Sequence, residues 1–303
     1  MNEPTILTIG NDEQRLGVLP ALGGSAAFWE VRRDDAWQPL WRPYQPSYDG
    51  RRIVSNFPLV PWSNRVTAGG ITVNGVFHPM ANNRDDVPYP IHGNGWMQVW
   101  QVEEHTDARI HMLLESHRHH DYPYDYEATQ TYAVEGEVMS MRLAVTHLGD
   151  TPMPYGLAWH PFYLRGADID GPRLQFAADG YWKETGSLPT DHVQGVPPDW
   201  DFNTLRTLGH GRIDNNFSGW NGRMRMERDD IDLALEWDTV EPAGLDLSIF
   251  FRPDNQPFFC FEPITHITDA FHRPGMPGLR MLSHGQSMAL EVRQRVSRLS
   301  HER

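Results

Sequence analysis

The sequence lacks, or has very little of, the residues on which several kinds of chemistry depend. Cys260 is the only cysteine among 303 residues, which excludes an intramolecular disulfide and a cysteine-based zinc cluster. Lys183 is the only lysine, so Schiff-base chemistry would have to depend on that one side chain. The net charge is −14 and no basic block occurs. We therefore expect neither nucleic acid nor a membrane surface as a partner.

Long apolar runs and helical patterns are also scarce. No run approaches the roughly 18 residues of a transmembrane helix, and residues 1–17 show no charged region followed by an apolar core, so we expect no signal peptide and a cytoplasmic location. Only residues 265–272, THITDAFH, indicate a turn or two of helix. With 39% hydrophobic and 11% aromatic residues, the chain still has the material for a substantial core.

Alternation of apolar and polar residues dominates what is present. Residues 138–147, VMSMRLAVTH, alternate with period two, which predicts a half-buried strand. Gly136 lies between this strand and a preceding strand-like run, as in a hairpin, and Asn74-Gly75 is a second hairpin signal. We predict an all-β fold, a large antiparallel β-sandwich forming a single domain over residues 1–303, with a loop-rich excursion at 182–212.

Three titratable residues occupy the same kind of place in this pattern. Glu262 ends the aromatic run FFCFEP, His160 ends GLAWHP, and His92 ends PIHG, each followed by Pro or Gly. A carboxylate or imidazole at the edge of an apolar segment is a candidate for general acid–base chemistry. The alternatives are a glutamate that turns into solvent and histidines that are ordinary core residues.

Two further segments supply polar candidates. Residues 56–66, NFPLVPWSNRV, end an apolar, proline-containing run in Asn64 and Arg65, which predicts an edge strand or structured loop that presents two donors. Asp214 opens the stretch RIDNNFSGWNG, which we interpret as rich in turns. An Asx-turn is the simplest alternative role for this aspartate.

In chain order these five motifs are NFPLVPWSNRV, PIHGNGW, GLAWHPFYL, RIDNNFSGWNG and FFCFEPITH. In this order and at this spacing they resemble those of the aldose 1-epimerase (galactose mutarotase) family. The resemblance extends from about Leu19 to the last strand. It implies a β-supersandwich and the interconversion of the α and β anomers of a free aldose, without metal or cofactor. It also implies a small-molecule sugar as the binding partner of a monomer or homodimer.

The resemblance also implies a role for each candidate residue. Glu262 matches the catalytic base, His160 matches the acid that protonates the ring oxygen, and His92 matches the second active-site histidine. The remaining matches are to substrate-binding positions, namely Asn64, Arg65 and Asp214.

The sequence departs from the family at several positions. Phe162 replaces a tyrosine common two residues after the acid histidine, Trp159 replaces an asparagine before it, and the segment after His92 lacks a common arginine. These departures leave the identity of the sugar open. Two alternatives also stay open, a glucose-6-phosphate 1-epimerase-like activity on hexose phosphates and a non-catalytic carbohydrate-binding module.

Other residues invite a functional interpretation with less support. The segment SHRHHDYPYDYE contains His117, His119, His120 and Asp121. His117 and His119 would share one face of a strand and form a candidate metal pair, but a polar hairpin tip is the better interpretation. Cys260 has no basic neighbour in sequence and is interpreted as a small core residue. Four tryptophans flank the motifs as possible sugar platforms or core residues, namely Trp62, Trp96, Trp159 and Trp220.

Overall fold

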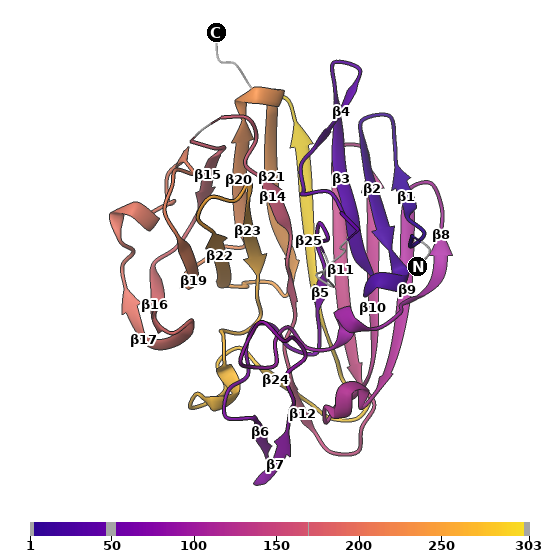
Figure 1. Cartoon of the computed structure of the whole chain (residues 1–303), viewed down its shortest axis with the longest axis vertical. Helices are drawn as coiled ribbons and strands as arrows, with labels where there is room; N and C mark the ends of the chain where they lie inside the picture. Colours follow the sequence, from indigo (N-terminus) through magenta and orange to yellow (C-terminus); the bar gives the residue numbers. More distant parts are fainter. Residues whose placement is uncertain (1–2, 47–52, 169, 300–303) are drawn as a thin grey trace.

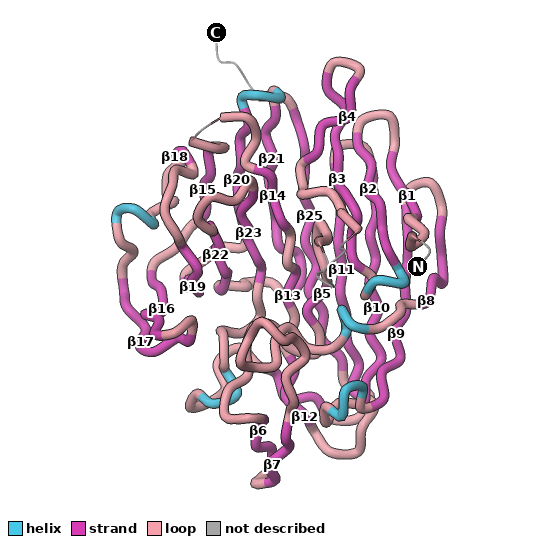
Figure 2. The backbone as a smooth tube through the Cα atoms, in the orientation of Figure 1, coloured by secondary structure: helices cyan, strands magenta, loops and turns pink. Residues whose placement is uncertain are grey.

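The computed structural model describes residues 3–46, 53–168 and 170–299, and nearly all of its regular structure is β (Figures 1 and 2). Within these ranges the helices are short 3-10 turns. Their bounds are Pro20–Leu22 (η1), Gly95–Met97 (η2), His119–Asp121 (η3), Pro198–Trp200 (η4), Asp229–Ile231 (η5) and Ala270–His272 (η6). None of them has the length or the hydrophobicity to cross a membrane. The helical signal at 265–272 therefore reduces to η6.

A nine-stranded antiparallel sheet forms one layer, in the order β18-β15-β20-β21-β25-β11-β10-β9-β8. Its strands are β8 (Gln101–His105), β9 (Arg109–His117), β10 (Asp125–Glu135), β11 (Val138–His147), β15 (Arg173–Phe176), β18 (Arg206–Thr207), β20 (Arg223–Arg228), β21 (Leu233–Glu241) and β25 (Ser287–Ser297). The strand predicted over 138–147 is confirmed, and its apolar set of Met139, Met141, Leu143 and Val145 is fully buried.

Two smaller antiparallel sheets form the facing layer. The four-stranded sheet contains β1 (Leu7–Gly10), β2 (Gln14–Leu19), β3 (Ser25–Arg33) and β4 (Ala36–Pro39). The six-stranded sheet has the order β14-β23-β22-β19-β16-β17. Its strands are β14 (Phe162–Leu164), β16 (Gly180–Thr185), β17 (Leu188–Gln194), β19 (Ile213–Ser218), β22 (Leu247–Arg252) and β23 (Phe258–Pro263).

Three two-stranded ribbons complete the regular structure of the described residues. They pair β5 (Pro58–Leu59) with β13 (Ala158–Trp159), β6 (Gly70–Val73) with β7 (Val76–Pro79), and β12 (Met153–Tyr155) with β24 (Arg280–Leu282). The β6–β7 ribbon turns at Asn74-Gly75, as predicted.

The two smaller sheets lie next to each other over the nine-stranded sheet (Figure 1). Backbone hydrogen bonds join them, because Arg42 N–H donates to the carbonyl of Phe162 and Leu164 N–H donates to that of Leu40. Across the layers, the Tyr163 hydroxyl donates to Gln294 Oε1 on β25 at 2.5 Å. The large antiparallel β-sandwich is therefore confirmed, whereas its organisation as a single domain over residues 1–303 stays a prediction.

One local prediction was wrong. Asp214 does not open a turn: it lies inside β19, which pairs along its whole length with β22. Pairing with a neighbouring strand overrides a composition rich in turn residues there. The segment 182–212 is loop-rich, as predicted, from 195 to 212, but it begins in the β16–β17 hairpin that ends the six-stranded sheet.

Candidate active site

The run FFCFEP forms β23, and its two faces serve different purposes. Side chains alternate across a strand, so Phe259 and Phe261 face the large hydrophobic core while Cys260 and Glu262 face the other way. All four are at most 3% exposed. Glu262 is therefore buried inside the molecule, and the alternative of a glutamate turning into solvent is wrong.

Strand register places the polar candidates on this second face. Residues directly opposite each other in neighbouring strands point to the same side of a sheet. One such row runs Phe162, Cys260, Phe251, Asp214, and the next runs Glu262, Ile249, Asn216. Asp214 and Glu262 thus face the same space, with Phe251 and Ile249 of β22 as an apolar floor between them.

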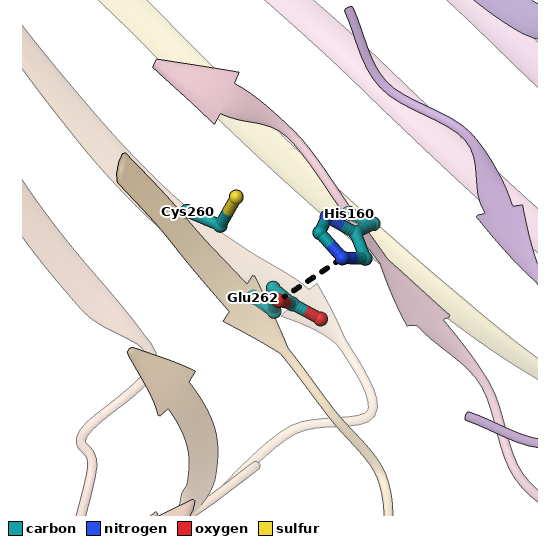
Figure 3. A group of neighbouring side chains, drawn as sticks. All are labelled: His160, Cys260 and Glu262. Atoms are coloured by element: carbon teal, nitrogen blue, oxygen red, sulfur yellow. Dashed lines mark ion pairs between the residues drawn. The ribbon is translucent and has the colours of Figure 1, made fainter. Parts of the chain in front are cut away.

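His160 completes the acid–base candidates directly beside Glu262 (Figure 3). Its Nε2 lies 3.5 Å from Glu262 Oε1. The His160 backbone N–H donates to Asn56 Oδ1 at 3.0 Å, which fixes the segment ahead of β14. Within the described residues, His160 Nδ1 and Glu262 Oε2 are buried without a hydrogen-bond partner. Buried polar atoms of native proteins are normally paired, so these two atoms mark a site that is built to contact something else.

An apolar and cationic surround depresses the basicity of His160. Its ring stacks on Phe57 and on Phe162, with centroids 4.8 and 4.6 Å away. The Arg42 guanidinium lies 3.7 Å from the centroid of the Phe162 ring. Burial, and secondarily the Arg42 charge, lower the pKa of His160 to about 3.

Burial has the opposite effect on the carboxyl beside it. It raises the pKa of Glu262 well above the ordinary value, Asp214 adds to the rise, and Arg65 opposes it. Both shifts disfavour separated charges in a dry surround. A proton shared by the pair is therefore favoured on Glu262 rather than on His160.

His92 faces His160 edge-on, with ring centroids 5.3 Å apart. The backbone N–H of Asn64 donates to His92 Nδ1 at 3.1 Å, and burial lowers the pKa of His92 well below its ordinary value. The ring is thus neutral with its proton on Nε2, which makes it a hydrogen-bond donor. Asn64 and His92 both have left-handed backbone angles (φ 56° and 62°), a costly conformation for residues other than glycine and one that clusters at functional sites.

Arg65 and Asp214 are brought to the same site. Arg65 donates to Asn64 Oδ1 at 3.0 Å and to the carbonyl of Ser187 at 3.3 Å. Asp214 accepts from Arg212 at 2.8 Å. Burial raises the pKa of Asp214, while Arg65 and Arg212 lower it. All six predicted site residues therefore gather around one face of the six-stranded sheet.

The sequence interpretation missed several residues that shape this site. Asn56 binds the His160 backbone and Phe57 stacks on its ring; they are the first two residues of the proline-containing motif at 56–66, which was a usable signal. Arg42 and Glu184 come from distant segments with no such signal. Burial raises the pKa of Glu184 to about 7; Asp214 contributes to the rise, and Arg65 and Arg212 oppose it.

The tryptophans near the motifs separate into two groups. Trp62, Trp159 and Trp220 are at most 2% exposed and belong to the hydrophobic core. Trp159 lies against Tyr132 in that core. Only Trp96 of the four is partly exposed; it lies edge-on to Phe57.

Side chains that could bind a metal ion lie close together in this candidate active site. Among the described residues, the one group of three potential ligands is His160, Cys260 and Glu262, with ligand atoms within 4.8 Å of one another. Burial holds the pKa of the Cys260 thiol well above its ordinary value, and the thiolate is the form that binds metals. The chemistry of this donor set in its present surround therefore fits a metal poorly.

The histidine-rich segment SHRHHDYPYDYE belongs to the β9–β10 connection, as the hairpin-tip interpretation predicts. His117 ends β9 and lies 3.6 Å from Asp125, with its side chain largely exposed. His119 is not on that strand, because it is the first residue of η3. The pair is therefore not presented on one strand face.

Comparison with known proteins assigns the sequence to a family. The model of the family described as aldose 1-epimerase matches residues 5–295. The chain is 31% identical over 298 residues to the uncharacterized protein YphB of Escherichia coli K12, covering 96% of this chain and 99% of that protein.

Solved structures agree as well. One from Escherichia coli K12, provisionally assigned as an aldose 1-epimerase, superposes with a TM-score of 0.87 at 30% identity, covering 97% of this chain and 99% of the other. Galactose 1-epimerase from Lactobacillus acidophilus shares the fold, with a TM-score of 0.78 at 17% identity over 96% of this chain and 93% of that one. With its matching motifs converging on one face of a matching fold, the chain belongs to the aldose 1-epimerase family.

Proposed function

We propose that this protein is an aldose 1-epimerase that interconverts the α and β anomers of a free aldose by opening and closing the sugar ring. The observation that carries the proposal is the buried His160–Glu262 pair, 3.5 Å apart, in which each side chain keeps one buried polar atom without a partner in the described residues. Family membership supports a carbohydrate epimerase.

The reaction needs two proton transfers that balance each other. Glu262 takes the proton from the hydroxyl on C1, the O1 electrons form the carbonyl, and the bond from C1 to the ring oxygen breaks. His160 gives its proton to the ring oxygen as that bond breaks. After rotation about C1–C2, His160 takes the proton back, the ring closes on the other face of C1, and Glu262 returns its proton to O1.

One proton shared by the pair suits this cycle. Ring opening starts with the proton on His160 and ends with a proton on Glu262, so the pair changes between its two one-proton forms and never gains or loses a net charge. The structure favours the form with the proton on Glu262, which is the form that closes the ring. Contacts between the sugar and the carboxylate, together with Arg65, would favour the other form.

The surrounding residues would bind the sugar and stabilise charge. His92 Nε2–H is a donor next to His160, placed to bind an oxygen near C1. The Arg65 guanidinium, which lowers the pKa of both Glu262 and Asp214, can donate to sugar oxygens. Asp214 can accept from ring hydroxyls, and Asn64 holds both His92 and Arg65 in place.

The proposal is tested by measuring anomer exchange on a panel of sugars, by polarimetry or NMR saturation exchange. The panel contains glucose, galactose, xylose, arabinose, fucose and glucose 6-phosphate. Faster exchange than the spontaneous rate on a free sugar supports the proposal. Acceleration of glucose 6-phosphate alone would instead favour a hexose-phosphate epimerase, and binding without acceleration would favour a carbohydrate-binding module.

A further inference from the structure

We propose that Glu184 on β16 is a further sugar-contacting residue, which acts with Asp214 to bind neutral hydroxyl groups at the end of the substrate away from His160 and Glu262. It follows that the site favours a neutral sugar over one that carries an anionic group at that end. This inference rests on the proposed function and names the substrate class it serves.

Strand geometry sets Glu184 against Asp214. β16 pairs with β19 only at Gly180 and Tyr181, opposite Ser218 and Phe217. Continuing the same register along both strands brings Glu184 opposite Asp214, beyond the point where pairing ends. A cavity of about 560 Å³ lies there, lined by both strands and including Glu184, Arg212 and Asp214.

The charges around Glu184 leave it available to a ligand. Arg212 is already paired with Asp214, and Arg65 donates to Asn64 and to the Ser187 carbonyl. Glu184 makes no ion pair with any residue that the structure describes. The neighbouring Asn216 amide helps to lower its pKa, but that amide donates to Thr268 Oγ1 at 3.1 Å. After burial, the negative charge of Asp214 is the largest cause of the raised pKa of Glu184, and Arg65 and Arg212 oppose it. Lys183 also lines the cavity, but it precedes Glu184 on β16 and so faces the other side of the strand.

Hydroxyl groups are the natural ligands for such a pair. Each can donate a hydrogen bond to a carboxylate, and hydroxyls on adjacent sugar carbons can serve Asp214 and Glu184 together. A phosphate or carboxylate at the same end would add negative charge beside two acidic groups, which is unfavourable.

Position in the sheet assigns Glu184 to binding rather than to proton transfer. The order β23-β22-β19-β16 puts β16 three strands from the strand that carries Glu262. At about 4.8 Å per strand the two backbones are about 14 Å apart. Glu184 therefore does not reach the atoms that react at Glu262, whereas Asp214, on the intervening strand β19, faces the same space as Glu262.

The test compares Glu184→Ala and Glu184→Gln with the wild type on glucose, galactose and glucose 6-phosphate at pH 8. Asp191→Asn is the matched control, because Asp191 is exposed on the same β16–β17 hairpin and its replacement removes the same charge. For Glu184→Ala we expect KM for a free sugar to rise about tenfold, the effect of one charge-assisted hydrogen bond, with kcat within about threefold. For Glu184→Gln we expect the ratio of kcat/KM for the phosphate to that for glucose to rise.

Each outcome decides the inference. A KM effect with a raised ratio, and no change in Asp191→Asn, supports it. Variants that match the wild type, or that lose kcat equally on all three sugars as a structural defect would produce, overturn it.

Failure of the proposed function gives a different result, in which the wild type accelerates no sugar. Calorimetric titration with glucose and galactose then tests Glu184 separately. Weaker sugar binding by Glu184→Ala than by the wild type would support its role. Equal binding, or no binding to the wild type, would overturn it.

Discussion

The two faces of β23, in the six-stranded sheet, are equally buried but have opposite chemistry. Toward the core, Phe259 and Phe261 of β23 pack among other aromatic rings. Toward the site, Cys260 and Glu262 of the same strand meet His160 (Figure 3). Burial of hydrocarbon stabilises the fold, whereas burial of a carboxyl and an imidazole shifts their pKa values toward the neutral forms. One strand thus packs against the core on one face and presents a buried carboxyl to the site on the other.

The largest effect is expected from His160→Asn, which removes the acid on the site face. We expect kcat for anomer exchange to fall by about 10²–10⁴-fold, the usual contribution of a positioned general acid or base. NMR saturation exchange at saturating sugar measures it, with His117→Asn as the control because that histidine is largely exposed at the end of β9, in the other layer of the sandwich. Equal losses in both variants would refute the assignment of His160.

A substitution on the core face should change the free energy of unfolding rather than kcat. The centroid of the Phe261 ring lies 4.9 Å from that of Phe176 and 5.3 Å from that of Trp220. Phe261→Ala should therefore lower the free energy of unfolding by about 3–5 kcal/mol. Urea denaturation followed by tryptophan fluorescence measures this change. The folded fraction of the variant should keep kcat within a few-fold of the wild type; a loss as large as that of His160→Asn would erase the difference between the faces.

A smaller effect concerns the dependence of kcat on pH. The pKa of His160 is lowered to about 3 and that of Glu262 is raised. The pair therefore gains a second proton only near pH 3, and it loses the shared proton only as pH rises through the raised pKa of Glu262. We expect kcat to stay level across pH 6.5, the ordinary pKa of histidine.

The measurement is the pH profile of kcat with the spontaneous rate subtracted. kcat is chosen over kcat/KM because Glu184, with a pKa of about 7, titrates in the same interval and is expected to act on binding. A tenfold fall per pH unit above pH 6.5 would mean that His160 titrates independently of Glu262.

The smallest expected effect is that of removing metal ions, which should not change kcat. The acid–base mechanism uses side chains of the chain itself, so dialysis against EDTA should leave kcat unchanged. The rate before and after dialysis, with the metal content of both samples determined, measures this. Loss of activity that returns with an added metal ion would show that the His160, Cys260 and Glu262 cluster works as a metal site.

Much of this arrangement could be predicted from local sequence, and the rest depended on pairing between distant segments. Alternation in VMSMRLAVTH was enough to predict β11, because an alternating strand must bury one face. The apolar-to-Pro boundaries identified Glu262 and His160 by their residue types, and the family motifs grouped them. That Asp214 is in a strand could not be predicted, because its turn-rich composition is overridden by pairing with β22. Arg42 and Glu184 could not be found at all, since only the fold brings them to the site.

Two of the departures from the family pattern also could not be interpreted from local sequence alone. Trp159 seemed relevant to sugar choice, but its side chain is in the core beside Tyr132. Phe162 is on the site face, where it stacks on His160 and carries Arg42 above it. These two substitutions lie three residues apart but in different strands: β13 pairs with β5, and β14 pairs with β23. Strand pairing of this kind is a property of the fold rather than of the local sequence.

The most direct test of the account measures two quantities on Glu262→Gln, the anomer exchange rate and the free energy of unfolding at pH 8. The raised pKa of Glu262 means that its contribution to stability is present below the ordinary glutamate pKa and is lost as pH rises through the raised value. Glutamine cannot ionise, so at pH 8 the variant should be at least as stable as the wild type. Its kcat should fall by about 10³-fold or more. A variant that keeps kcat within tenfold, or that loses stability as Phe261→Ala does, would contradict the claim that this face of the sheet is built for acid–base chemistry.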